Sequence, residues 1–144
     1  MLGKTYKGIA LAALLSIMGF WCASAQEQAQ ALEAGAFHGK AHKTSGRATI
    51  YKGADGQLLL RLTNFKTSNG PDVHVVLIAA KDADDDANFL KSSTEKIELG
   101  ALKGNQGDQN YTIPAGTDLD KFQTVSIYCV RFNVNFGAAP LKRL

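Results

Sequence analysis

Alternating apolar and polar positions predict β-strands along most of the chain. Residues 46–53 and 57–65, GRATIYKG and QLLLRLTNF, predict two strands, and the Gly-Ala-Asp-Gly sequence at 53–56 predicts the hairpin turn between them. The run VHVVLIAA at residues 73–80 is almost wholly apolar. Such a run is typical of a central strand covered on both faces.

Shorter strands are expected at residues 96–99 and 110–114, with a single helical turn possible at 115–122. No segment has the periodicity of a long amphipathic helix. Short strands separated by Gly, Pro and Asn predict an all-β fold. We expect an antiparallel β-sandwich of about seven or eight strands, Ig-like in general architecture.

The closing segment, TVSIYCVRFNVNF at residues 124–136, changes its alternation halfway. Apolar residues occupy odd positions up to Cys129 and even positions from Val130 onward. One regular strand cannot bury both sets on one face, because side chains alternate with period two. The pattern predicts a β-bulge at Cys129-Val130. The alternatives are a bend between sheets and a strand covered on both faces.

The first 25 residues have the features of a signal peptide. Lys4 and Lys7 precede an apolar run that ends at Trp21, and Ala-Ser-Ala at 23–25 matches a signal-peptidase site. The apolar run is short for a membrane span, which makes an uncleaved anchor the weaker interpretation. A lipoprotein site at Cys22 is weaker still, because bulky residues precede it. The sequence therefore predicts an exported protein, periplasmic or extracellular.

Cleavage after Ala25 would leave 119 of the 144 residues, enough for one domain with a hydrophobic core. Residues 26–35 are polar and Ala-rich and predict a flexible tether, with the folded domain at 36–144. Without the two leader lysines, 14 basic residues face 13 acidic ones, a net charge of +1. No basic stripe indicates nucleic-acid binding, and no further segment predicts membrane insertion.

Cleavage would also leave Cys129 as the only thiol. An unpaired cysteine in an exported protein indicates an intermolecular partner, a reactive thiol or a small buried hydrophobic residue. Its apolar neighbours favour burial, and a thiol buried among apolar groups is inert. The neighbours Tyr128 and Arg131 favour reactivity, because a nearby cation lowers the pKa of a thiol.

The three histidines are His38, His42 and His74. Structural roles are the first expectation for all three. His42, His74 and Cys129 form a weaker alternative as a copper or zinc site. That set lacks the axial methionine of a blue-copper centre, since neither methionine would remain after cleavage.

Four segments carry a family resemblance, and they occur in this order: FHGKAHKTSGRATIY, LTNFKTSNGPDVHVVL, LGALKGNQGDQNYTIP and VSIYCVRFNVNFGAAPL. Together they resemble the DM-thirteen (DM13) domain family, from Phe37 to Leu141. The resemblance implies an extracytoplasmic β-sandwich with a proposed role in electron transfer. It implies that Cys129 is a bare redox thiol or helps to hold a prosthetic group, with Tyr128 where the family often has tryptophan.

The resemblance further implies a separate redox partner, because related domains in animals are often coupled to a haem-carrying domain and no such domain is present in this sequence. We therefore expect a redox accessory domain centred on Cys129, with haem supplied by a partner. The alternative is a non-catalytic binding module in which Cys129 is structural and the loops TSNGPD and GNQGDQ recognise the ligand. Both hypotheses favour an accessory domain over a stand-alone enzyme.

Overall fold

The computed structural model describes residues 3, 29–83 and 93–144. Apart from Gly3, the predicted signal peptide lies outside this range. The ten strands of the described chain are β1 (Gln30–Ala36), β2 (His38–Gly39), β3 (Ser45–Lys52), β4 (Leu58–Lys66), β5 (Val73–Ile78), β6 (Lys96–Ala101), β7 (Gln109–Ile113), β8 (Thr124–Cys129), β9 (Val134–Pro140) and β10 (Lys142–Arg143).

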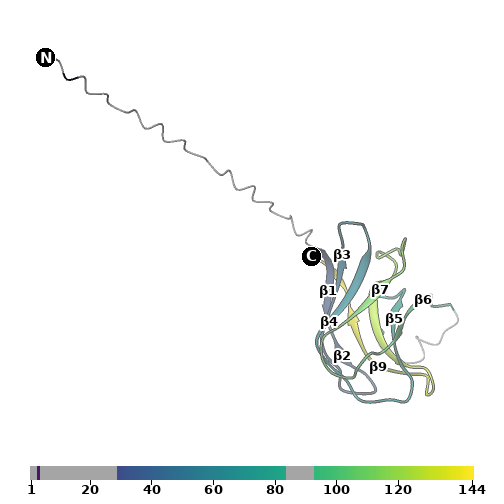
Figure 1. Cartoon of the computed structure of the whole chain (residues 1–144). Helices are drawn as coiled ribbons and strands as arrows, with labels where there is room; N and C mark the ends of the chain where they lie inside the picture. The colour runs from purple at the N-terminus through teal and green to yellow at the C-terminus, as the bar shows by residue number, and fades with distance from the viewer. Residues whose placement is uncertain (1–2, 4–28, 84–92) are drawn as a thin grey trace.

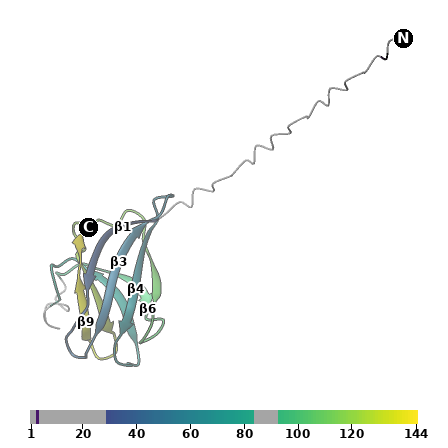
Figure 2. The same ribbon diagram turned by 90° about the vertical axis from the view of Figure 1, so that its left-hand side faces the viewer.

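The strands form two five-stranded antiparallel sheets packed face to face, which confirms the all-β sandwich (Figures 1 and 2). One sheet has the order β10-β1-β3-β4-β7, and the other has the order β2-β9-β8-β5-β6. Eight of the strands have five or more residues. The described part of the chain contains no helix long and apolar enough to cross a membrane.

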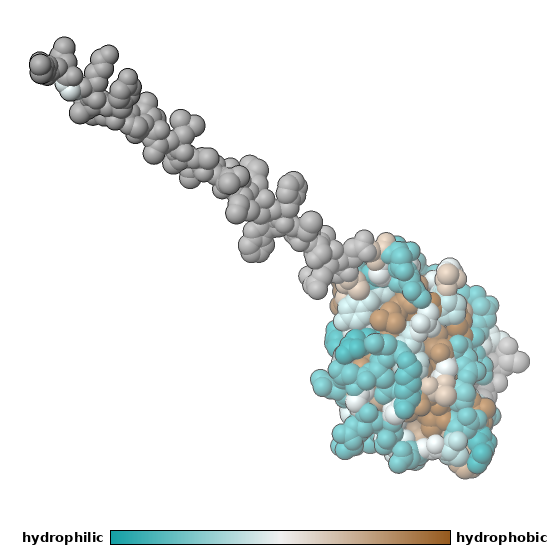
Figure 3. Space-filling view, viewed as in Figure 1, coloured by the Kyte–Doolittle hydropathy of each residue, from teal (hydrophilic) through white to brown (hydrophobic). Residues whose placement is uncertain are grey.

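The core lies between the sheets because each sheet turns one set of alternating side chains inward. Ile50, Leu60 and Leu62 contribute from the first sheet, and Val75, Val125 and Ile127 from the second. All six side chains are fully buried. On the outside, hydrophobic residues form a band down the middle of one face, with hydrophilic residues on both sides (Figure 3).

The β3–β4 hairpin forms at the predicted turn. The Gly56 N–H donates to the Gly53 carbonyl at 2.9 Å, and Gly56 has a φ of 81°. Glycine suits this position because other residues rarely adopt positive φ. The segment at 115–122 forms turns, in which the Phe122 N–H donates to the Asp118 carbonyl at 3.1 Å.

The predicted tether at 26–35 is wrong from Gln30 onward, because those residues form β1. This strand pairs with β3 on one side and β10 on the other. Its backbone hydrogen bonds are made with strands that lie elsewhere in the sequence. Its own alanine-rich composition is not typical of a strand, so the sequence did not predict one here.

The closing segment is also not a single bulged strand. β8 ends at Cys129, residues 130–133 form a turn, and β9 returns from Val134. Asn133 takes a φ of 57°, which asparagine tolerates better than most residues. The β-bulge lies on β9, where pairing moves from Ile127↔Gly137 to Tyr128↔Asn135 and leaves Phe136 as the extra residue. The turn and this bulge together account for the change in alternation.

Glu33 of β1 is a buried carboxylate whose removal should stabilise the fold. Its side chain is 7% exposed, and Oε2 has no hydrogen-bond partner among the described residues. Burial raises the pKa of Glu33, although the nearby Arg143 opposes the shift. The folded state therefore holds the proton more tightly than the unfolded state. The wild-type protein should gain stability from Glu33 as pH falls through the raised pKa toward 4.5.

We expect Glu33→Gln to raise the free energy of unfolding by about 1 kcal/mol at pH 7, because it removes a buried charge whose Oε2 has no hydrogen-bond partner among the described residues. The gain should disappear at a pH well below 4.5, where both side chains are neutral. Urea denaturation at the two pH values measures this difference. Glu95→Gln is the control, since that carboxylate is 61% exposed and should give a small change. Equal stabilities of wild type and Glu33→Gln at pH 7 would contradict the prediction.

Candidate functional site

Cys129 is the last residue of β8, and its thiol is free and fully buried. It pairs with Val73 on β5 and with Val134 on β9. Its side chain belongs to the cluster between the two sheets. A thiol enclosed in this way is shielded from solvent reagents.

The loop before β5 covers the end of the core where Cys129 lies. Gly70 approaches the core so closely that a Cβ placed there would lie 2.7 Å from Val73 Cγ2 and 2.9 Å from Phe136 Cζ. Both of those side chains belong to the same cluster as Cys129. The Val130 N–H donates to the Asp72 carbonyl at 2.9 Å. Residues 70–72 are therefore attached to the chain immediately after the cysteine.

The turn that follows Cys129 carries exposed apolar side chains. Val130 is 45% exposed and Phe132 is 62% exposed, and Arg131 between them is also exposed. We call residues 130–132 the hairpin tip. The Asn133 N–H donates to the Val130 carbonyl at 3.3 Å and closes the turn. An exposed phenylalanine beside an arginine is typical of surfaces that contact other proteins.

Tyr128 lies on the opposite face of the sheet from the thiol, because successive side chains of a strand alternate. It packs in a second cluster with Val76 and Ala138, and its hydroxyl donates to Asn133 Oδ1. Lys96 Nζ lies 5.6 Å from the centroid of the ring. The thiol therefore lies on the opposite face of the sheet from the aromatic ring, and Arg131 is exposed in the turn that follows, although the sequence predicted both beside the thiol.

Tyr128 also lines a cleft of about 400 Å³ on this outer face. The other lining residues are His74, Val76, Lys96, Glu98 and Val130. The ring of His74 stands between two carboxylates. Nε2 lies 2.7 Å from Asp72 Oδ1, and Nδ1 contacts Glu98 Oε1. Burial lowers the pKa of His74, but the hydrogen bonds to Asp72 and Glu98 outweigh it and raise the pKa above its ordinary value.

The other histidines lie elsewhere. His38 of β2 contacts Asp82, with Nε2 at 2.8 Å from Oδ1. His42 is exposed, with its ring centroid 4.2 Å from that of Phe136. His42, His74 and Cys129 are not brought together, and the described ranges contain no group of three or more metal-binding side chains. The weaker metal alternative therefore has no assembled site here.

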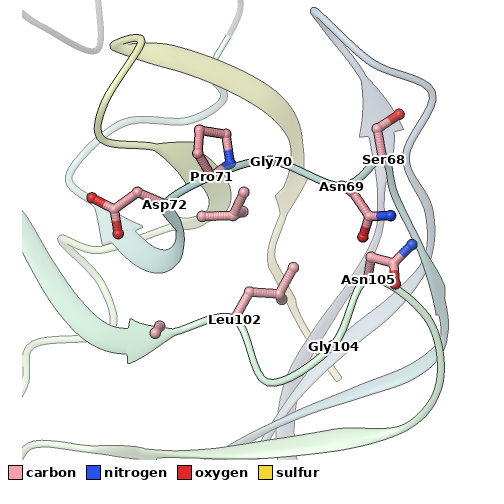
Figure 4. Close-up of a pocket in the computed structure, with 10 residues that line it drawn as sticks. Ser68, Asn69, Gly70, Pro71, Asp72, Leu102, Gly104 and Asn105 are labelled. Atoms are coloured by element: carbon pink, nitrogen blue, oxygen red, sulfur yellow. The ribbon is translucent and has the colours of Figure 1, made fainter.

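The two loops of the alternative hypothesis do meet. Residues 68–73, together with 101, 102, 104 and 105, line one cleft of about 330 Å³ (Figure 4). The side chains of Asn69 and Asn105 point toward each other, while the Asp72 carboxylate points away from them (Figure 4). The Thr67 N–H donates to the Asn105 carbonyl at 2.8 Å and holds the two walls together.

The described residues form a small β-sandwich domain with one free, buried thiol. The family described as "Electron transfer DM13" matches residues 36–141, which include Cys129. The chain belongs to this DM13 family. No curated protein and no solved structure matches the chain. The family's description supports a general redox-related role.

The sequence pointed to Cys129 and His74, and to Asp72 beside His74, but not to the other contacts around them. Asp72 was visible as a carboxylate two residues before His74, hence on the same face of an extended chain. Glu98 gave no such signal, because it lies on another strand. The sequence predicted only that Gly70 lies in a loop. Its contact with the core depends on the tertiary fold.

Proposed function

We propose that this protein is an exported electron-transfer module whose redox group is the thiol of Cys129, acting with a separate partner protein. The observation that carries the proposal is the position of Cys129 in the family-matched range. It is the free thiol of the described residues, and it directly precedes the exposed hairpin tip. Export is supported by the signal-peptide features of residues 1–25.

In the oxidising direction, the thiol gives one electron to an oxidised one-electron centre of the partner. The S–H bond breaks, its proton leaves to solvent, and a thiyl radical remains. The reverse step restores the thiol. Because the side chain is fully buried, the proton can leave only when the end of the sandwich opens. This end opens transiently in the isolated protein, and the hairpin tip is the exposed surface nearest in sequence at which a partner would dock.

A haem held directly by Cys129 does not fit the described residues. The thiol faces the packed core between the sheets and is fully enclosed. A haem would therefore belong to the partner, as the family resemblance implies. The role of this chain is then to present a shielded thiol near an exposed apolar surface.

Cys129→Ala tests the proposal. We expect the mature wild-type protein, residues 26–144, to consume about one equivalent of ferricyanide per chain, and the variant to consume none, because it lacks the only thiol. The packing cost should be on the order of 1 kcal/mol, so the variant should stay folded. Val125→Ala, on the same strand and face, keeps the thiol and should behave as wild type in the titration.

Equal consumption by Cys129→Ala would place the redox group elsewhere. If the wild-type protein consumes ferricyanide only after denaturation, Cys129 is structural and the proposal fails. Both results come from the same titration, followed with and without urea.

A second candidate function is a binding module that uses the cleft of Figure 4. It is favoured by the meeting of two polar loops in one cleft, with Asn69 and Asn105 facing each other. In this function Cys129→Val would leave binding unchanged, whereas Asn69→Ala or Asn105→Ala would weaken it. Ligand binding would then not depend on ferricyanide consumption, whereas the electron-transfer function requires that consumption. The two candidates therefore predict different results.

A further inference from the structure

The loop formed by residues 68–72 is attached beside Cys129 at three places. Gly70 packs on Val73 and Phe136, the Asp72 carbonyl accepts from the Val130 N–H, and the Asp72 carboxylate contacts His74. The first two are a packing contact and a backbone hydrogen bond, which do not depend on protonation. The third joins two titratable side chains.

His74 can satisfy both neighbouring carboxylates only when it is charged. An imidazolium has two N–H donors, one for Asp72 and one for Glu98. A neutral imidazole has one donor, so its other nitrogen would present a lone pair to a carboxylate. Loss of the proton therefore removes one charge-assisted hydrogen bond and adds a repulsive contact.

Among the described residues, the charged and titratable groups around His74 come from three elements. Asp72 lies in the loop before β5, Lys96 and Glu98 lie on β6, and Tyr128 lies on β8. Lys96 lines the same cleft, and its Nζ lies over the Tyr128 ring. The two carboxylates contact the ring nitrogens directly, and they outweigh the burial that would lower the pKa of His74.

We propose that His74 is a proton-dependent latch that holds loop 68–72 over the Cys129 end of the core. Protonated His74 ties the loop to β5 and β6. After deprotonation two contacts still hold the loop: the backbone hydrogen bond of the Asp72 carbonyl and the packing of Gly70. The end of the core then opens more often. The use of this opening for electron transfer rests on the proposed function, whereas the latch itself does not.

The direction in which pH changes the stability follows from the raised pKa of His74. The folded state binds the proton more tightly than the unfolded state, whose ordinary value is 6.5. The stabilising interaction is fully present below pH 6.5 and is lost as pH rises through the folded-state pKa. The loop should therefore be closed in mildly acidic conditions and more mobile in alkaline ones.

The test is the rate at which 5,5′-dithiobis(2-nitrobenzoate) labels Cys129 in the folded mature protein over a range of pH. Each rate is divided by that of the urea-denatured protein at the same pH, which removes the titration of the thiol itself. We expect the normalised rate to rise roughly tenfold as His74 loses its proton, the effect of one lost charge-assisted hydrogen bond. Circular dichroism at each pH confirms that the protein is folded.

His74→Gln should give the fast normalised rate at every pH. His38→Gln is the matched control, because it also removes a histidine–carboxylate contact but on β2, and it should follow the wild type. Glu98→Gln removes one carboxylate while keeping the histidine. It should shift the midpoint to lower pH, and it tests the latch if His74→Gln does not fold.

A normalised rate that is independent of pH in the wild type would overturn the latch. So would a His38→Gln profile altered as much as that of His74→Gln, because the effect would then be general destabilisation. Ferricyanide consumption is measured separately. A pH-dependent labelling rate without ferricyanide consumption would support the latch and contradict the redox function, while the reverse result would contradict the latch alone.

Discussion

Phe136→Ala should lower the free energy of unfolding by about 3–5 kcal/mol, the usual cost of deleting a buried aromatic side chain. Phe136 is 3% exposed and packs in the cluster between the sheets. Gly70 sits directly against its ring, and the ring of His42 contacts it with the two centroids 4.2 Å apart. The cavity would therefore open at the end of the core where Cys129 lies. Urea denaturation measures the loss.

The unfolding should be followed by circular dichroism, because the only tryptophan, Trp21, precedes the predicted cleavage site. Phe132→Ala is the matched control. It makes the same substitution four residues earlier, on the same hairpin, at a side chain that is 62% exposed. Its stability should change by no more than about 0.5 kcal/mol. Similar losses in both variants would mean that Phe136 does not anchor this end of the core.

Phe136→Ala should also label faster at Cys129 than Phe132→Ala does, since Gly70 would lose its contact with the Phe136 ring. This result would link the packing of loop 68–72 to the access of the thiol. A slow, unchanged labelling rate in a destabilised Phe136→Ala protein would show that Cys129 is reached by another route.

The sequence predicted the sandwich because most strands bury one face. In β4, for example, Leu60 and Leu62 face the core and Arg61 between them does not, so the alternation of types follows the alternation of faces. The Gly53–Gly56 turn was equally visible, because its chemistry is local. Where the determining interactions lie within about ten residues, the prediction was right.

The prediction failed where distant partners decide the structure. β1 has no alternating pattern, and its strand conformation depends on pairing with β3 and β10. The change of alternation near Cys129 was real, but a turn and a bulge at Phe136 together explain it. A parity change alone does not distinguish a bulged strand from a hairpin with an unusual turn.

The candidate site was also predicted where the sequence is informative locally and missed where distant strands decide. The family resemblance pointed to Cys129, and its apolar neighbours indicated burial, but no local signal joined His74 to Glu98. The pairing of β5 with β6 shifts between Val75↔Gly100 and Val76↔Glu98. Leu99 is therefore an extra residue, and Gly100 takes a φ of 132°. This bulge aims Glu98 at the outer face beside His74, which the spacing in the sequence does not show.

The second large effect is expected at Gly35 of β1, in the segment that the sequence predicted to be a tether. If residues 30–35 were a tether, a methyl group at Gly35 would have no consequence. In the structure a Cβ there would lie 1.9 Å from the Pro140 carbonyl oxygen and 2.8 Å from its carbon, because β1 passes directly against the end of β9. Both are backbone atoms, so relief requires the two strands to separate.

We expect Gly35→Ala to lower the free energy of unfolding by roughly 3 kcal/mol, the upper part of the usual range for overpacking. Gly104→Ala is the control, since the nearest atom to its added Cβ is the Gln106 carbonyl oxygen at an ordinary 3.5 Å. That variant should be neutral or gain up to about 1 kcal/mol from a stiffer unfolded chain. Urea denaturation of both variants in the mature protein distinguishes a packed strand at residues 30–35 from a tether. A neutral Gly35→Ala would return residues 30–35 to the status of a tether, whereas the expected loss makes β1 an integral strand whose path is fixed by Pro140.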